Sequence, residues 1–202
     1  INILIQDGQA YADLLSAVLS FEIDVSGAGV SLDDGAYSVF RRALVSVNST
    51  LMDDIDFLPK KVNAEMYATV DQDWYNSVGS MIGCWKHNTT VYGTNDVAGT
   101  GFIDKYAVAL KQALAASVQK KNSKNKFFVP VCLLSHFFRN EMLFPLRNAG
   151  QLYLQLNLAS AAEALVGATI TEYTIKNLTL EMDFIDLHPT YLAMMDEVME
   201  RP

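Results

Sequence analysis

Alternation of apolar and polar residues with a period of two restricts the fold of this 202-residue chain more than any other feature. It is strict over 19–25 and recurs over 152–158 and 173–184. Because successive side chains of a strand point to opposite faces, such segments predict strands with one buried and one solvated face. The segments expected to form strands are 14–25, 41–48, 127–134, 151–158 and 173–185.

Two irregularities interrupt these strands. The alternation changes phase after Ile175 and resumes at Leu178, which predicts a β-bulge near Lys176 and Asn177. Pro130 lies inside an apolar segment, and proline has no N–H to donate to a neighbouring strand. It therefore predicts a strand that stops pairing early and turns into a short helix.

Helical character is confined to the connections and the C-terminal segment. Apolar residues four apart predict helices over 63–85 and 102–118, and Pro189 followed by apolar residues predicts a terminal helix or linker over 188–202. Strands at both ends with long, partly helical excursions between them favour an all-β fold with helical loop insertions. We expect one antiparallel jelly-roll β-sandwich over 1–187.

The charge distribution argues against a domain whose main surface binds nucleic acid. The chain has 15 Lys and Arg against 23 Asp and Glu, a net charge of −8, whereas phosphate binding needs an excess of basic side chains. One basic cluster stands out, made of Lys120, Lys121, Lys124 and Lys126. It is typical of a solvated loop, and a patch that touches packaged genome or membrane lipid is the alternative.

Residues that could support catalysis or hold a cofactor are sparse. His87, His136 and His188 are far apart and lack the His-x-His spacing of a metal-dependent jelly-roll oxygenase. Ser135 precedes His136, but no GxSxG turn is present. We therefore expect no enzymatic activity, no cofactor and no metal.

Two other residue groups have mainly structural interpretations. Asp53, Asp54 and Asp56 could bind calcium, but they lack the glycine and distal glutamate of a calcium loop, and a charged surface turn is favoured. Cys84 and Cys132 have no paired spacing and are expected to be reduced.

The most informative block of the sequence is 127–158. An apolar strand with an internal proline leads to an aromatic segment, a Pro-Leu step and an alternating strand introduced by glycine. This order resembles double jelly-roll major capsid proteins of eukaryotic DNA viruses, in the lineage of Polinton-like viruses, virophages and giant viruses. Residues 173–180 are similar to the closing strand of the N-terminal roll in that family. The positions that carry the resemblance are Phe128, Pro130, Phe137, Phe138, Arg139, Pro145, Leu146, Tyr173 and Asn177.

This resemblance implies a structural protein of the virion. Family members form homotrimers with a pseudo-hexagonal outline, and these capsomers tile an icosahedral shell. The implied partners are other copies, neighbouring capsomers, penton or minor capsid proteins, and an inner membrane or genome without sequence-specific contacts. A double roll needs roughly twice this length, so we expect one roll of a longer protein, with 188–202 leading to a second roll, or a protein assembled from single rolls.

Aromatic residues define the expected interfaces and the rival hypotheses. In the pairs Phe127-Phe128 and Phe137-Phe138, we expect one member in the core and the other at a subunit contact. A carbohydrate-binding jelly-roll module is the alternative, with an exposed platform formed by Trp74, Trp85 or Tyr92. An enzyme on a jelly-roll scaffold is the third hypothesis, and the scarcity of histidine argues against it.

Overall fold

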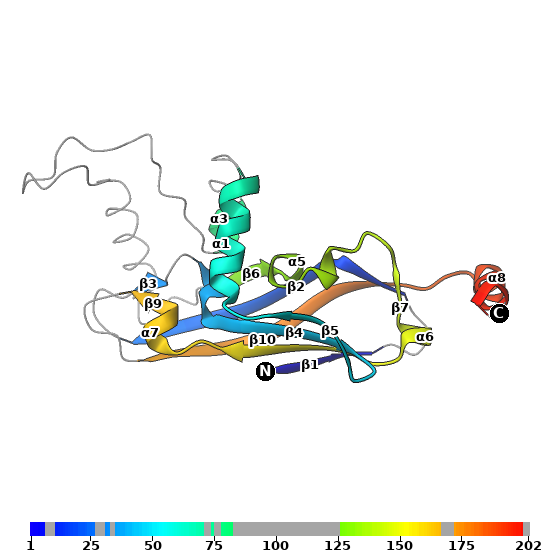
Figure 1. The fold of residues 1–202 in the computed structure, drawn as a ribbon, viewed down its shortest axis with the longest axis horizontal. Coiled ribbons are helices and arrows are strands. Elements are labelled where there is room, and N and C mark those ends of the chain that lie inside the picture. The colour runs from blue at the N-terminus through cyan, green and yellow to red at the C-terminus, as the bar shows by residue number, and fades with distance from the viewer. Residues whose placement is uncertain are drawn as a thin grey trace, which may run out of the picture.

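The computed structural model describes residues 1–6, 11–26, 31–32, 35–70, 74, 78–82, 126–166 and 172–199. Strands dominate this part of the chain, and all their pairings are antiparallel. Figure 1 shows long strands stacked along the long axis of the molecule, with one helix rising from them and another beyond one end. The protein is therefore a mostly β structure decorated with short helices.

Two larger sheets and one small strand pair make up the β structure. Sheet A contains, in spatial order, β1 (Asn2–Ile5), β8 (Leu152–Leu158), β4 (Phe40–Val47) and β5 (Thr50–Ile55). Sheet B contains β10 (Glu172–Ile185), β2 (Tyr11–Ser26) and β6 (Lys126–Pro130), and β7 (Phe144–Pro145) also pairs with β2. The small pair is β3 (Ser31–Leu32) with β9 (Leu165–Val166).

Strand pairs are nested along the chain. β2 pairs with β10, β3 with β9 and β4 with β8. The chain thus passes from β2 in sheet B through β3 to β4 in sheet A. It later runs back from β8 in sheet A through β9 to β10 in sheet B, antiparallel to its first passage. The three strand pairs form one long antiparallel ribbon. The β2–β10 pair is the end that lies in sheet B, and the β4–β8 pair is the end that lies in sheet A.

The core lies between the two sheets and is built from the alternating residues. Phe21 of β2 meets Phe40 of β4 edge to face, with 5.3 Å between ring centroids, and Phe21 lies 6.4 Å from Phe127 of β6. Leu154 and Leu156 of β8 are fully buried, whereas Gln155 between them is exposed. Burial with a period of two confirms the strand prediction for these segments.

Short helices connect and flank the strands. They are η1 (Ala36–Val39), α1 (Leu58–Thr69), α3 (Val78–Met81), α5 (Val131–Leu134), η2 (Phe137–Arg139), α6 (Leu146–Ala149), α7 (Ala161–Ala164) and α8 (Pro189–Met199). Within the described ranges, no helix is long and apolar enough to cross a membrane.

Most strand predictions are confirmed. The segments predicted over 14–25, 41–48, 151–158 and 173–185 correspond to β2, β4, β8 and β10. The predicted bulge is present as a register shift between Lys176 and Thr179. The predicted terminal helix is α8, with Pro189 as its first residue.

Two expectations need correction. The strand predicted over 127–134 ends at Pro130, because the chain turns there into α5, the short helix that Pro130 itself predicted. A continuous helix over 63–85 is wrong: α1 starts at Leu58, next to Pro59, and ends before Val70, whose backbone is extended. Strands β1 and β5 were not foreseen. The helix expected over 102–118 lies outside the described residues.

Candidate assembly surfaces

A pair of stacked sheets leaves two long sides where the edge strands of the two sheets face each other. On one side, helix α1 contacts β4 and α5, and both helices contribute apolar residues to the core. Leu58, Val62 and Met66 of α1 and Val131 and Leu134 of α5 are at most 2% exposed. We call this side the closed seam.

A carboxylate on β5 fixes the loop that follows α5. Asp53 Oδ2 accepts hydrogen bonds from Ser135 Oγ at 2.5 Å, His136 N at 2.8 Å and Phe137 N at 3.3 Å. Three donors on one carboxylate oxygen hold the chain in place as it enters η2.

The interpretation of the acidic group as a surface turn is wrong for Asp53 and Asp54, whereas Asp56 lies in an exposed bend after β5. Asp53 and Asp54 lie on strand β5 and not in a surface turn, and Asp54 forms a bidentate ion pair with Arg42 on the neighbouring strand. Among the described residues no group of three or more His, Cys, Asp and Glu side chains could hold a metal ion.

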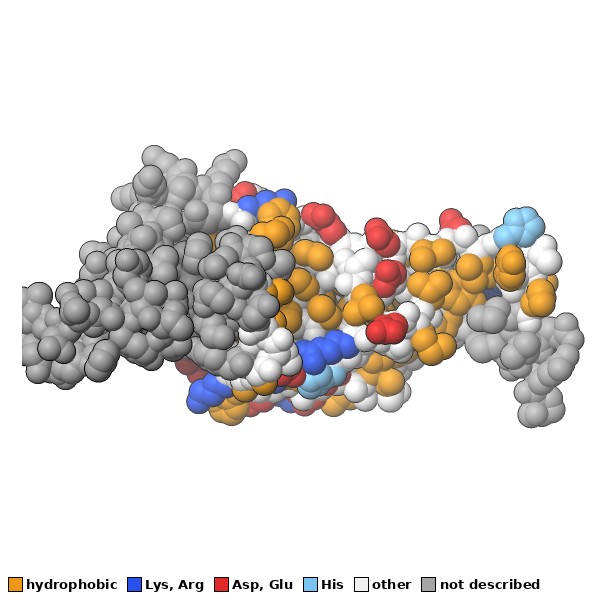
Figure 2. All heavy atoms as spheres, turned by 90° about the horizontal axis from the view of Figure 1, so that it is seen from above, with side chains coloured by type: hydrophobic (Ala, Val, Ile, Leu, Met, Phe, Trp, Pro, Cys, Tyr) orange, Lys and Arg blue, Asp and Glu red, His pale blue; other side chains and the backbone are white. Residues whose placement is uncertain are grey.

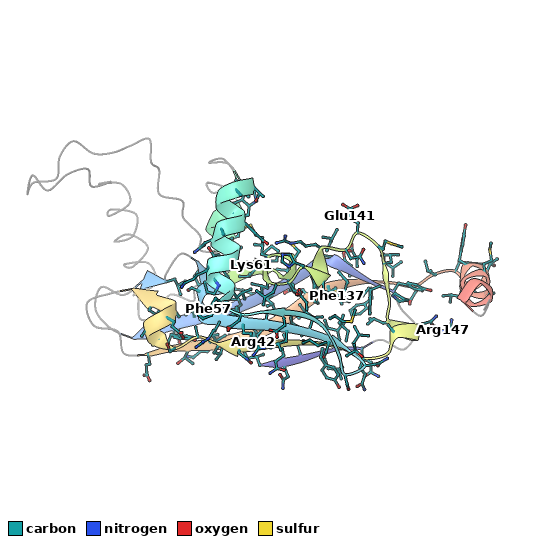
Figure 3. All side chains as sticks on the ribbon, in the orientation of Figure 1. Arg42, Phe57, Lys61, Phe137, Glu141 and Arg147 are labelled. Carbon is teal, nitrogen blue, oxygen red and sulfur yellow. The ribbon has the colours of Figure 1, made fainter. Side chains whose placement is uncertain are left out.

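Glu65 of α1 binds the same loop from the opposite side. Its carboxylate lies 2.9 Å from His136 Nε2 and 3.1 Å from Lys61 Nζ, and it accepts a hydrogen bond from Arg139. Lys61 of α1 and Phe137 of η2 lie on this same side of the molecule (Figure 3). Burial raises the pKa of Glu65, but hydrogen bonds from Arg139, His136 and Lys61 outweigh it, and the pKa falls to about 2.

Removing the charge of Glu65 should make the free energy of unfolding vary less with pH in the acidic range. Because its pKa is lower in the folded state, the contribution of Glu65 is complete above about pH 4.5 and is lost as the pH falls toward 2. We expect Glu65→Gln to lower the free energy of unfolding by about 2 kcal/mol at pH 7. The difference from wild type should shrink between pH 4.5 and 2, as measured by urea unfolding at each pH.

Glu141→Gln serves as the control, because Glu141 is an exposed carboxylate on the loop after η2. It should leave the free energy of unfolding nearly unchanged across the same pH range. A Glu65→Gln penalty that stays constant from pH 7 to 2 contradicts the assigned ion cluster.

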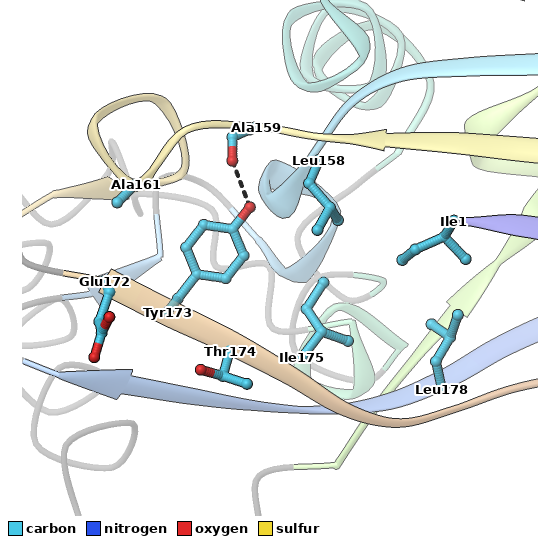
Figure 4. A pocket seen from close by; sticks show the side chains of 9 residues that line it. All are labelled: Ile1, Leu158, Ala159, Ala161, Glu172, Tyr173, Thr174, Ile175 and Leu178. Atoms are coloured by element: carbon cyan, nitrogen blue, oxygen red, sulfur yellow. Dashed lines mark hydrogen bonds between the residues drawn. The ribbon is translucent and has the colours of Figure 1, made fainter.

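The opposite side, between β1 and β10, is open. Each of these two strands has a strand neighbour on one side only in the described sheets. A groove of about 670 Å³ runs between them (Figure 4). It is lined by Ile1, Leu158, Ala159, Ala161, Glu172, Tyr173, Thr174, Ile175 and Leu178. Ile1 and Leu158 are 40% and 47% exposed, and we call this side the open seam.

Tyr173 bridges the two sheets across the open seam. Its hydroxyl donates to Ala159 O at 2.5 Å, as drawn in Figure 4, and lies 3.3 Å from Val39 O. Burial, with a smaller contribution from Glu163, raises the pKa of Tyr173, so the phenol remains a donor. This contact ties β10 to the chain that links β8 and α7.

Asn177 sets which side chains of β10 face the groove. Its φ of 52° is in the left-handed region, which asparagine tolerates better than most residues. The bulge at this position changes the phase of the strand, so that both Ile175 and Leu178 line the groove. Without the extra residue, one of them would point to the outer face.

Exposed apolar side chains also gather at one end of the molecule. Phe184 of β10 and Phe144 of β7 pair with Ala12 on opposite sides of β2, which brings three segments together. The exposed members are Leu15 (42%), Met142 (75%), Leu143 (38%), Phe184 (46%) and Ile185 (37%). Figure 2 shows hydrophobic side chains gathered toward this end, and we call the five residues the end surface.

The motif positions divide between the two seams. Tyr173 and Asn177 lie on β10 at the open seam, whereas 128–146 runs along the closed seam toward the end surface. Phe138 and Leu146 are buried in the core, and Arg139 donates to Cys132 O at 2.8 Å. Most of these positions therefore stabilise the fold. Those that are half-buried are Phe128, Pro130, Phe137, Pro145 and Tyr173.

The prediction that one member of each Phe pair lies in the core is confirmed. Phe127 and Phe138 are 6% and 0% exposed, while Phe128 and Phe137 are half-buried. Phe137 packs edge to face against Phe144, at 5.5 Å between ring centroids. The role of the outward members in subunit contacts stays a prediction.

The remaining candidate residues from the sequence are half-buried or lie outside the described residues. Trp74 is half-buried and packs against the core, which leaves little of it for an exposed platform. Cys132 is a free cysteine and is half-buried. Outside the described residues lie Cys84, Trp85, His87, Tyr92, Lys120, Lys121 and Lys124.

Sequence reasoning missed a second cavity, of about 370 Å³, at the start of α1. Phe57, 51% exposed with a φ of 53°, lies beside it, and Arg41 and Lys60 sit over the Phe57 ring at 5.3 and 5.4 Å. Phe57 is therefore an exposed aromatic ring beside a cavity, with two cations over it.

Comparison with known proteins yields no relative for this chain. No protein-family model matches it, no curated protein matches it, and no solved structure matches it. The functional argument therefore depends on the fold and on the surfaces described above.

Proposed function

We propose that the chain is a jelly-roll building block of an icosahedral DNA-virus capsid, similar to the N-terminal roll of a double jelly-roll major capsid protein. The observation that carries the proposal is the nesting of β2 with β10, β3 with β9 and β4 with β8. A jelly roll arises when such a folded antiparallel ribbon wraps into two facing sheets, and viral capsid domains use this architecture.

The exposed surfaces support a role in assembly. The open seam and the end surface both present apolar side chains to solvent, and contiguous exposed apolar surface marks interaction sites. Weak contacts repeated by symmetry give a stable closed assembly. In this proposal the roll is joined to a second roll, three such double rolls form a trimeric, pseudo-hexagonal capsomer, and the virion shell is its place of action.

Further partners follow from the proposed position in a shell. Neighbouring capsomers and penton or minor capsid proteins meet the sides of the capsomer, and an inner membrane or the genome lies beneath it. The net charge of −8 favours protein contacts over tight binding of nucleic acid. We propose no enzymatic activity and no cofactor.

Light scattering on the purified protein tests the function. A trimer of the double-roll product, without binding to a glycan array, is the expected result. A monomer across the accessible concentration range that binds a glycan, and loses this binding in Phe57→Ala, would instead establish the carbohydrate-binding alternative. That variant probes the exposed ring beside the second cavity.

A further inference from the structure

Sheet B ends one strand earlier than sheet A at the open seam. Phe21 of β2 contacts Phe40 of β4, so these two strands lie opposite each other. Next to them, Tyr173 of β10 bonds to Ala159 at the end of β8. β1 continues sheet A beyond β8, whereas no described strand continues sheet B beyond β10. Within the described sheets, the position beside β10 and opposite β1 can therefore accept one further strand.

The apolar side chains around this position are only partly covered. Ile175 and Leu178 of β10 are half-buried, and Ile1 and Leu158 on the sheet A side are 40% and 47% exposed. All four line the groove of about 670 Å³ (Figure 4). A strand beside β10 would direct every second side chain into this groove, so apolar residues at those positions would be buried between the sheets.

The backbone of β10 restricts the conformation of the occupant. β10 pairs with β2 along one edge, and no strand among the described residues pairs with the other edge. An edge strand presents a row of N–H and C=O groups, and an extended peptide satisfies them by adding a strand to the sheet. A helix would fill the groove without pairing this row. The edge therefore favours an extended polypeptide segment.

The outer side of β10 restricts the charge of the occupant. Glu172, Glu181 and Asp183 are exposed there, and the one lysine of the strand, Lys176, forms an ion pair with Asp24. Like charges opposite each other on neighbouring strands are destabilising. Two β10 strands from two copies would bring these acidic rows together. The charges therefore favour a basic segment of a different protein over a second copy.

We propose that the open seam binds an extended segment of a partner protein, which adds a strand to sheet B beside β10. Apolar side chains of the added strand lie in the groove, and basic side chains alternate with them on the outer side. The inference rests on the proposed function in treating the open seam as an assembly surface, and it names the chemistry of the partner there.

A peptide of alternating valine and lysine, with blocked ends and a fluorescent label, is the probe. We expect saturable binding to the full chain, measured by fluorescence anisotropy. The same peptide with methylated backbone nitrogens keeps its charge but donates no backbone hydrogen bonds. It should bind about tenfold more weakly or worse. Equal binding of the two peptides overturns the inference, because the edge of β10 is then not used.

Substitutions on the two sides of β10 test the position of the peptide. Ile175→Lys places a charge in the groove and should weaken binding by about tenfold or more. Glu181→Lys reverses a charge on the outer side and should weaken it by about threefold. Circular dichroism confirms that each variant is folded.

Two matched controls carry the same changes elsewhere. Leu51→Lys changes a 55% exposed apolar residue on β5, and Glu141→Lys reverses an exposed carboxylate on the loop after η2. Both should bind the peptide like wild type. A loss in Glu141→Lys equal to that in Glu181→Lys shows that only the net charge attracts the peptide, and this overturns the inference.

The outcomes separate this inference from the proposed function. If the peptide does not bind and the double-roll product still forms its trimer, strand addition is overturned and the capsid proposal stands. If the peptide binds and the double-roll product stays monomeric, the capsid proposal alone is overturned. Self-association of the chain that is lost in Ile175→Lys assigns the seam to a second copy and overturns the basic partner.

Discussion

Phe21→Ala is expected to lower the free energy of unfolding by about 4 kcal/mol. The ring of Phe21 is fully buried between the sheets and contacts Phe40 of sheet A and Phe127 of the neighbouring strand. Its removal leaves a cavity at the junction of three strands that these rings cannot close, because their backbones are fixed by strand pairing. Urea unfolding followed by circular dichroism measures the loss.

Phe128→Ala provides the matched control. Phe128 is only half-buried on the outer face of β6, one residue from the buried Phe127. We expect this substitution to cost about 1 kcal/mol, in line with its smaller buried area. Equal costs at the two positions would mean that the sheets do not face each other through Phe21.

Gly150→Ala is expected to lower the free energy of unfolding by about 3 kcal/mol. Gly150 has a φ of 79°, which favours glycine, and an added Cβ would collide with Asn48 Oδ1. Asn48 cannot move without breaking its hydrogen bonds, since Nδ2 donates to Ala149 O at 2.5 Å and Gln151 N donates to Oδ1 at 3.0 Å. Strain and lost hydrogen bonds therefore act together.

Asn148→Ala, at an exposed position in the same turn, separates this effect from a general sensitivity of the turn. It should change the free energy of unfolding by less than about 0.5 kcal/mol. A Gly150→Ala variant as stable as wild type would show that the link between the β4–β5 turn and β8 does not depend on this glycine.

Local sequence patterns predicted the long strands well. Alternation placed β2, β4, β8 and β10 to within a few residues, and the phase change at Lys176 and Asn177 placed the bulge, because both features follow from the period of a strand. The early end of β6 followed from Pro130 for a chemical reason, the missing N–H donor.

Features that depend on the tertiary structure were not predictable in this way. β1 is too short for a pattern, and in β5 the two aspartates obscured the strand, because their roles are set by Arg42 and by the loop at Ser135. The open seam requires knowledge of which strands lie at the sheet edges. The cluster around Glu65 unites residues more than 70 positions apart.

Electron microscopy of the purified protein tests the central claim most directly, because it shows the shape of the assembly. The account predicts threefold particles in which three double rolls give a pseudo-hexagonal outline, and which associate side by side at high concentration. Isolated single-copy particles at every concentration, with no threefold class among them, would contradict it.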